Sequence, residues 1–322
     1  MRKKVRENVQ SPLFLQAALQ ERIWGGKKLR EFSYELSSDL VGECWGISAH
    51  TNGQSVVRDG KYKGFTLEKL WNENRVLFGD ISGEKFPLLT KILDANQDLS
   101  IQVHPNNEFA NVNENGEFGK TECWYIIDCK EGAEIIYGHH AQTKEEFVEM
   151  IQLGKWNELL RHVPIKPGDF FYVPSGTIHA LCEGTLVLET QQSSDTTYRV
   201  YDYDRVDGNG NKRELHLDKA LAVSSIPHKD FSLSIQEKEK NGAKITTFVK
   251  EQYFSVYKWE IGQEASFQQD KCFQLASVIE GEGIIVTVEG EFPLRKGDHF
   301  ILPNTLEDFI IRGNVTLIVS HP

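Results

Sequence analysis

Two strands with one polar face each, between residues 99 and 125, constrain this chain most. The segment LSIQVHPNNEFANVNENGEFGKTECWY predicts a strand, a long loop and a second strand. In the first strand, aliphatic and polar residues alternate, so the two-residue period of a strand places Gln102 and His104 on one face. In the second strand, Lys120 and Glu122 share a face in the same way. The two strands therefore direct an amide, an imidazole, an ammonium and a carboxylate into one space, which a hydrophobic core would not require.

Three of these side chains carry the donor atoms of a metal site. Gln102, His104 and Glu122 offer the nitrogen and oxygen ligands that zinc accepts, and a catalytic zinc also keeps an open position for water or substrate. His179 is a candidate fourth ligand, because VPSGTIHAL predicts a turn followed by a strand that carries it. The spacing alone also allows an alternative in which Gln102 and Glu122 are exposed strand residues and both histidines are satisfied core residues.

Two further cations stand in strand-like segments. Lys91 interrupts the apolar run FPLLTKILDA, and since buried strands seldom carry an unpaired lysine, it either faces a cavity or pairs with Asp94. Arg199 alternates with tyrosines in SSDTTYRVYDYDR, a pattern that on its own also fits a stacked surface pair. The short strand ECWGIS, in contrast, is assigned to packing.

The charge balance limits the partners of this chain. It carries 36 Lys and Arg residues against 47 Asp and Glu residues, for a net charge of −11. Such an acidic protein is a poor nucleic-acid binder. A phosphorylated small molecule would need cations that are concentrated locally. The basic residues on the motif strands therefore matter more than the total charge.

Membrane, secretion and cysteine signals in the sequence limit where the protein is expected to be found. No stretch approaches the roughly 18 apolar residues of a membrane-spanning helix, so we expect no membrane association. The first residues, MRKKVRENVQSPLFLQ, are basic but lack the apolar run of a signal peptide. The five cysteines are odd in number and have no CxxC spacing, so reduced thiols are the simplest account. We therefore expect a cytoplasmic protein, whose oligomeric state the sequence does not indicate.

The periodicity changes once, and one motif is repeated. The segment TKEEFVEMIQLGKWNELLRHV has helical spacing and opens with Thr143 three residues before Glu146, a capping box. Residues 166–180, KPGDFFYVPSGTIHA, align without gaps on residues 295–309, RKGDHFILPNTLEDF. Asp308 stands at the position of His179. The C-terminal unit is therefore expected to repeat the first one without its metal ligands.

The motifs IQVHP, GKTECWY and PSGTIHA, in this order and at these separations, resemble the type I phosphomannose isomerases of the cupin superfamily. The resemblance implies a mainly β protein with two cupin-type (jelly-roll) barrels and a small helical insert. We expect a catalytic barrel over residues 1–142 and 163–225, the insert over 143–162, and a second barrel without metal ligands over 226–322. The resemblance also implies one zinc per chain. Its four ligands would be Gln102, His104, Glu122 and His179.

The same resemblance implies a reaction. Family members interconvert mannose 6-phosphate and fructose 6-phosphate, which moves a proton between C1 and C2 through a cis-enediol. A metal would stabilise the negative charge of the enediolate as a Lewis acid. Arg199 and Lys120 would add positive charge at the substrate, with Lys91 a weaker contact. Glu189 is the candidate proton carrier, and a zinc-bound water or His104 released from the metal are alternatives that the sequence leaves open.

Two other functions fit parts of the same pattern. An iron dioxygenase on a cupin fold would favour two histidines and one carboxylate, and Gln102 argues mildly against it. Dependence on O₂ would separate that enzyme from an isomerase. A non-catalytic sugar-phosphate-binding protein would keep the barrel without turnover, and the complete set of candidate ligands argues against it.

Overall fold

The computed structural model describes residues 9–206 and 210–322. The chain forms two compact units, and each unit is built from segments that are not contiguous in the sequence. The site unit consists of residues 19–45 and 89–233, and the terminal unit of the described part of residues 1–18 together with 46–88 and 234–322. The expectation about a leader segment falls mainly on residues 1–8, which lie outside the described residues.

Two antiparallel sheets form the site unit. The six-stranded sheet has the order β10-β7-β12-β5-β3-β2, and the five-stranded sheet has the order β13-β6-β11-β8-β9. The strands of the first sheet are β2 (Ala18–Gly26), β3 (Val41–Ile47), β5 (Leu88–Ala95), β7 (Glu122–Cys129), β10 (Phe170–Val173) and β12 (Thr185–Gln192). Those of the second are β6 (Ile101–Val103), β8 (Glu134–His139), β9 (Leu160–Pro164), β11 (His179–Leu181) and β13 (Tyr198–Tyr201).

A shared apolar cluster joins these two sheets. Trp124 and Val187 contribute to it from the six-stranded sheet, and Ile135 and Leu181 from the five-stranded sheet. Alternation along each strand directs these side chains inward, and their burial removes apolar surface from water at about 25 cal/mol per Å². The polar side chains that share this inward face are therefore enclosed between two sheets.

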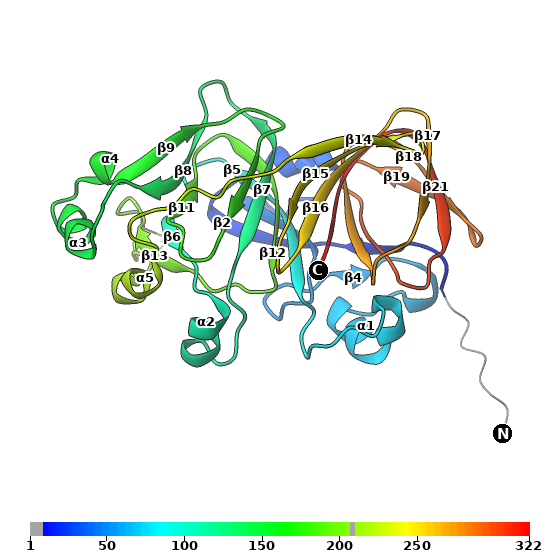
Figure 1. Cartoon of the computed structure of the whole chain (residues 1–322), viewed down its shortest axis with the longest axis horizontal. Coiled ribbons are helices and arrows are strands. Elements are labelled where there is room, and N and C mark those ends of the chain that lie inside the picture. Colours follow the sequence, from blue (N-terminus) through cyan, green and yellow to red (C-terminus); the bar gives the residue numbers. More distant parts are fainter. Residues whose placement is uncertain (1–8, 207–209) are drawn as a thin grey trace. The chain divides into compact units, whose positions relative to one another are not determined.

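Helices lie against the five-stranded sheet. They are α2 (Asn107–Asn113), α3 (Lys144–Gln152), α4 (Trp156–Leu159) and α5 (Leu217–Val223). Figure 1 shows α3 and α4 beyond the ends of β8 and β9, and α2 at the bottom of the view, in the connection from β6 to β7. Phe147 of α3 and Ala220 of α5 pack into a second apolar cluster with Ile101 and Val103 of β6.

The segment expected to be helical, 143–162, contains α3 and α4, but its last three residues belong to β9, and one further helix was not predicted. Thr143 caps α3 by accepting a hydrogen bond from the Glu146 amide at 3.2 Å. Helix α2 lies in the segment that the sequence predicted to be only a long loop. It begins after Asn106, whose side chain accepts from the Phe109 amide at 2.9 Å, and the seven-residue helix carries one buried apolar residue, so it shows no amphipathic period.

The terminal unit is built on one ten-stranded antiparallel sheet. Its main order is β14-β15-β16-β21-β18-β20-β1-β4, with β17 on β21 and β19 on β18. These strands are β1 (Leu13–Gln16), β4 (Val56–Val57), β14 (Gln236–Lys240), β15 (Ala243–Lys250), β16 (Ser255–Ile261), β17 (Glu264–Gln268), β18 (Gln274–Thr287), β19 (Gly290–Arg295), β20 (His299–Leu302) and β21 (Asp308–His321). Helix α1 (Leu67–Glu73) belongs to this unit.

The boundaries of these units differ from the expected domains. Residues 9–18 and 46–88 were expected in the N-terminal barrel, but they belong to the terminal unit. The reason is strand pairing, since Leu13 of β1 pairs with Ile301 of β20, and Leu15 pairs with Val57 of β4. Hydropathy patterns do not encode which distant strand a segment joins, so the sequence could not supply this division.

The repeated motif keeps its register in three dimensions. β10 begins at Phe170 and β20 at His299, the aligned positions, and β11 and β21 begin at His179 and Asp308. Asp308 is exposed, whereas His179 is buried. Among the described residues, the only group of three or more His, Cys, Asp or Glu residues suited to a metal includes His179 and lies in the site unit.

A buried histidine in the terminal unit predicts a pH dependence of stability. His299 lies against Gly46, and its Nδ1 is 2.7 Å from the Ser277 hydroxyl. Burial lowers the pKa of His299 from 6.5 to about 4. The unfolded chain takes up a proton on this histidine below about pH 6.5, but the folded protein does not do so until the pH nears 4. About 3 kcal/mol of the unfolding free energy is therefore present above about pH 6.5 and is lost as the pH falls toward 4.

We therefore expect His299→Gln to lose less unfolding free energy than the wild type on acidification. Urea unfolding at about pH 7 and about pH 4.5 measures this difference. An equal loss in both proteins would contradict the assignment to His299.

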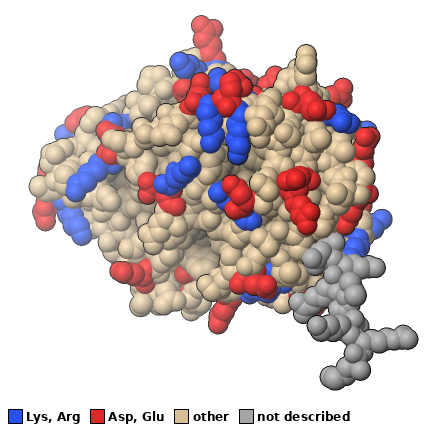
Figure 2. All heavy atoms as spheres, turned by 45° about the vertical axis from the view of Figure 1, so that its right-hand side comes forward, with Lys and Arg blue, Asp and Glu red and all other residues tan. Residues whose placement is uncertain are grey.

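Within the described part of the chain, no helix has the length and apolarity needed to span a bilayer. On the face shown in Figure 2, acidic and basic side chains are interspersed. The surface on this face therefore combines both signs of charge.

Candidate metal centre

Three strands of the five-stranded sheet align the residues of the predicted site. Gln102 of β6 pairs with His179 of β11 on one side and with Arg199 of β13 on the other. His104 follows β6 by one residue, at the point where Pro105 ends the strand. Glu122 begins β7 in the facing sheet. The fold thus brings segments separated by up to 97 positions to one place.

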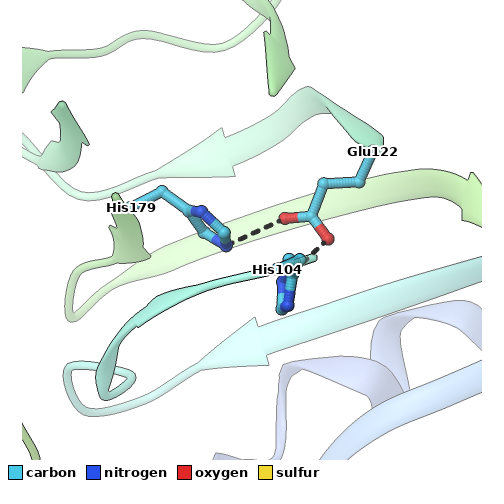
Figure 3. A group of neighbouring side chains, drawn as sticks. All are labelled: His104, Glu122 and His179. Atoms are coloured by element: carbon cyan, nitrogen blue, oxygen red, sulfur yellow. Dashed lines mark ion pairs between the residues drawn. The ribbon is translucent and has the colours of Figure 1, made fainter. Parts of the chain in front are cut away.

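His104, Glu122 and His179 form a compact buried group. Their potential ligand atoms all lie within 4.8 Å of one another. One carboxylate oxygen of Glu122 is 3.4 Å from Nε2 of His104, and the other is 3.2 Å from Nε2 of His179. Figure 3 shows the carboxylate directed at both rings. The interpretation of these residues as exposed strand positions and core histidines is therefore wrong for Glu122, which is buried.

The backbone fixes which nitrogen of each imidazole faces the group. Nδ1 of His104 lies 2.9 Å from the Thr196 carbonyl oxygen, and Nδ1 of His179 lies 2.8 Å from the Thr177 carbonyl oxygen. A carbonyl oxygen only accepts, so both Nδ1 atoms carry the proton and both neutral rings present an Nε2 lone pair to Glu122. This is the arrangement in which histidines serve as metal ligands.

The donor set fits a divalent cation. The buried Nε2 of His179 has no hydrogen-bond partner and faces Oε1 of Glu122. Two acceptors that face each other at 3.2 Å without a proton between them repel, and a cation between them would remove that cost. Burial, together with the ammonium of Lys120, lowers the pKa of His104 from 6.5 to about 3, so the ring is neutral near pH 7.

Lys120 is part of the same group. Its Nζ is 2.9 Å from Glu122 and donates to Nε2 of His104 at 3.0 Å. Burial alone would raise the pKa of Glu122, but Lys120, His104 and His179 together outweigh it and hold that pKa well below the usual range. The predicted common orientation of Lys120 and Glu122 is confirmed, although β7 begins only at Glu122.

Glu189 lies on β12, opposite Trp124 of β7. The indole Nε1 of Trp124 donates to its Oε2 at 2.9 Å, and Nζ of Lys91 is 3.8 Å from its Oε1. Burial, followed by the negative charge of Glu122, raises the pKa of Glu189. A buried carboxyl with a raised pKa and one oxygen still available is suited to carry a proton.

Lys91 faces the same cavity, which was one of its two predicted alternatives. Its Nζ lies between Glu189 and Glu43, at 3.8 and 3.9 Å, and over the Trp45 ring at 4.5 Å. The alternative, a pair with Asp94, is wrong. Residues 91 and 94 point to opposite faces of β5, and Asp94 instead accepts from the Lys28 amide at 2.8 Å.

Sequence reasoning missed part of the cavity wall. Glu43 belongs to ECWGIS, which was assigned to packing, yet its carboxylate accepts from Trp45 at 2.6 Å and from Arg22 at 2.9 Å. Burial opposes ionisation, but Lys91 and Arg22 lower the pKa of Glu43 to about 2. A glutamate in a wholly buried strand was the available signal. No such sequence signal marked Arg213, because it follows a polar turn.

All five remaining predicted residues line one polar cavity of about 390 Å³ together with Glu122. These five are Lys91, Gln102, Lys120, Glu189 and Arg199. Arg199 donates to the Glu214 carbonyl oxygen at 3.1 Å, so it is not a stacked surface residue. The wall also includes Arg22, Glu43, Asp195 and Arg213. A cavity with this many charges is suited to a polar, charged ligand.

Fold and site define a mainly β protein of several sheets, consistent with a cupin fold, with a buried group that could hold a metal. Two family models match the chain. The model for the phosphomannose isomerase type I catalytic domain matches residues 13–143, and that for the mannose-6-phosphate isomerase cupin domain matches residues 244–322. The chain belongs to the type I phosphomannose isomerase family, which confirms the resemblance drawn from its three motifs.

Individual relatives match over nearly the whole length. The mannose-6-phosphate isomerase ManA of Bacillus subtilis is 56% identical over 96% of this chain and 98% of its own. A mannose-6-phosphate isomerase of Streptococcus mutans is 51% identical over 96% and 98%. The crystal structure of the Bacillus subtilis mannose 6-phosphate isomerase matches with a TM-score of 0.96 at 57% identity, covering 97% of this chain and 100% of that one. A phosphomannose isomerase variant from Salmonella typhimurium, at 17% identity and a TM-score of 0.78, shares the fold.

Proposed function

We propose that this protein is a zinc-dependent isomerase that interconverts mannose 6-phosphate and fructose 6-phosphate through a cis-enediol. The observation that carries the proposal is the buried His104, Glu122 and His179 group, whose potential ligand atoms converge beside a charged cavity. The family and its close relatives supply the substrate and the reaction.

His104, Glu122 and His179 would hold the zinc, with Gln102 as the fourth ligand on the neighbouring strand. When bound, the zinc would supply a Lewis acid for the negative charge that develops on the sugar oxygens. A neutral amide in place of a second carboxylate leaves more positive charge on such a metal. The Thr196 and Thr177 carbonyls hold the two rings in the orientation and tautomer that ligation requires.

Glu189 would move the proton between C1 and C2. Its Oε2 is occupied by the Trp124 indole, so Oε1 is the atom available to the substrate. Lys91 lies close to Oε1 and would orient a substrate hydroxyl there. Lys120 and Arg199 would stabilise the charge of the enediolate from the cavity wall.

Several finer features are part of this proposal. The paired sheets of the site unit and the curled ten-stranded sheet are each compatible with a cupin barrel, and the repeated β10-β11 and β20-β21 motif supports a common origin. A cytoplasmic location is consistent with the five free thiols. The substrate is a small-molecule sugar phosphate.

The test joins metal analysis to an isomerase assay. The purified protein is expected to bind one zinc per chain and to convert fructose 6-phosphate to mannose 6-phosphate, with activity lost on chelation and restored by zinc. Turnover that requires O₂ would favour the dioxygenase. Folded, zinc-loaded protein that binds mannose 6-phosphate without converting it would favour the binding protein.

A further inference from the structure

The cations of the cavity differ in how far neighbouring carboxylates neutralise them. Lys120 is paired with Glu122 at 2.9 Å. Arg22 is paired with Glu43 at 2.9 Å, and Lys91 lies between Glu43 and a second carboxylate. These parts of the wall are therefore close to electrically neutral. A phosphate dianion would gain little binding free energy there, because each cation already has a carboxylate partner.

The wall around Arg213 is different, because two guanidinium groups share one carboxylate. Arg213 donates through Nε at 2.7 Å and Nη2 at 2.6 Å to the two oxygens of Asp202. Arg205 donates to Asp202 as well, at 2.6 Å, and to the Asp98 carbonyl oxygen. The Asp202 side chain is only 4% exposed, so these contacts lie inside the protein and hold the two guanidinium groups in place. The hydrogen bonds from the two arginines lower the pKa of Asp202 although burial opposes them.

Arg199 adds a third guanidinium group beside Arg213. Its Nε is buried and has no hydrogen-bond partner. Burial and the charge of Arg213 both lower the pKa of Arg199, which reports that the two cations repel each other. Asp195 is the carboxylate of the cavity wall that interacts with Arg199, and it interacts with Lys120 as well. Asp202 and Asp195 oppose these three guanidinium groups, and Glu214, the third carboxylate that acts on Arg199, is 84% exposed and therefore screened by water. The cavity side of this end therefore has excess positive charge.

The backbone places this end away from the candidate metal centre. His216 donates its amide to the Arg199 carbonyl at 2.8 Å, so the segment after Arg213 runs along the outer side of β13. From there the order is β13, β6 with Gln102, and β11 with His179. Neighbouring strands are about 4.8 Å apart, so Arg213 and the histidines can contact opposite ends of one extended ligand.

We propose that Arg213, oriented by the buried carboxylate of Asp202, binds the phosphate group of the substrate and selects phosphorylated over free sugars. This inference rests on the proposed function. Asp202 occupies Nε and Nη2 of Arg213, which leaves the remaining amino group, together with Arg199, to meet the phosphate oxygens. Asp202 is a positioning residue here, since it acts through Arg213.

Arg213→Met tests the proposal through kinetics and through phosphate binding without turnover. Losing a charged hydrogen bond and the charge itself should raise KM for mannose 6-phosphate about 10- to 100-fold and leave kcat within about threefold. The dissociation constant for inorganic phosphate, measured by calorimetry on zinc-loaded protein, should rise by a similar factor. Asp202→Asn keeps the charge of Arg213 but loosens its orientation, so its effect on KM should be smaller and in the same direction.

Lys212→Met is the matched control. Lys212 neighbours Arg213, pairs with Asp204 at 2.6 Å and is 62% exposed, so its loss removes one positive charge without changing the cavity wall. Its phosphate affinity should match that of the wild type. Equal weakening in Lys212→Met and Arg213→Met would overturn the proposal in favour of a long-range charge effect.

Two further outcomes are decisive. Phosphate affinity within about twofold of the wild type in Arg213→Met, or a fall in kcat at constant KM, would overturn the inference. If Arg213→Met does not fold, Arg213→Lys replaces it, because it keeps the charge and loses the two-point contact with Asp202. An unchanged phosphate affinity in that variant would overturn the inference too. A wild type that binds phosphate through Arg213 but does not isomerise would contradict only the proposed function.

Discussion

Replacement of His104 by Ala is expected to abolish most isomerase activity and to leave the protein with well below one zinc per chain. The ring supplies one of the three converging ligand atoms, and Thr196 holds it in the ligating tautomer. Because partners that only orient a metal ligand already contribute about 10- to 100-fold, losing the ligand itself should cost more than about 100-fold in kcat/KM. Zinc content by elemental analysis and the rate of fructose 6-phosphate conversion measure the two effects.

His162→Ala is the control for this variant. His162 lies on β9, is 40% exposed and pairs with Glu134, so its removal leaves the candidate metal centre intact. It should keep both zinc and activity. A His104→Ala protein that is folded and retains one zinc with near wild-type turnover would remove His104 from the ligand set.

Glu189→Gln is expected to lower kcat about 10²- to 10⁴-fold while zinc remains bound. The amide keeps the shape of the side chain and can still contact Trp124 and Lys91, but it cannot carry the proton. In the wild type, the raised pKa of Glu189 should place the acid limb of the pH profile above the 4.5 of an ordinary glutamate. Activity rises with pH there because the deprotonated form is the base. The variant should lack this limb.

Glu183→Gln, at an exposed glutamate paired with Lys130, is the matched control and should be unaffected. Turnover in Glu189→Gln close to that of the wild type, with the same acid limb, would assign proton transfer to another group. His104 and water at the metal are then the remaining candidates.

The sequence was sufficient for those parts of the site that lie within one motif. Alternation in IQVH and the spacing of Lys120 and Glu122 predicted which side chains share a face, and these side chains meet in the structure. The gap-free repeat predicted two pairs of strands with the same offsets. In these cases a local period decides the orientation, and burial of the opposite face enforces it.

The remaining features depend on contacts between distant segments. Arg213 becomes a wall residue only because its segment follows β13, and Glu43 only because β3 joins the six-stranded sheet. Helix α2 depends on its Asn106 cap more than on any apolar period. The division into units depends on the pairing of β1 with β20, which begins 286 positions later. A local window of sequence carries no signal for that pairing.

That last pairing has a consequence for how the molecule is made. β20 emerges near the end of synthesis, so β1 can pair early with β4 but lacks its other partner until nearly all of the polypeptide has left the ribosome. The site unit, in contrast, has all of its strands by residue 201 and can assemble earlier. In a nascent chain the site unit could thus fold first, and the terminal unit would be completed only when its C-terminal strands pair with β1.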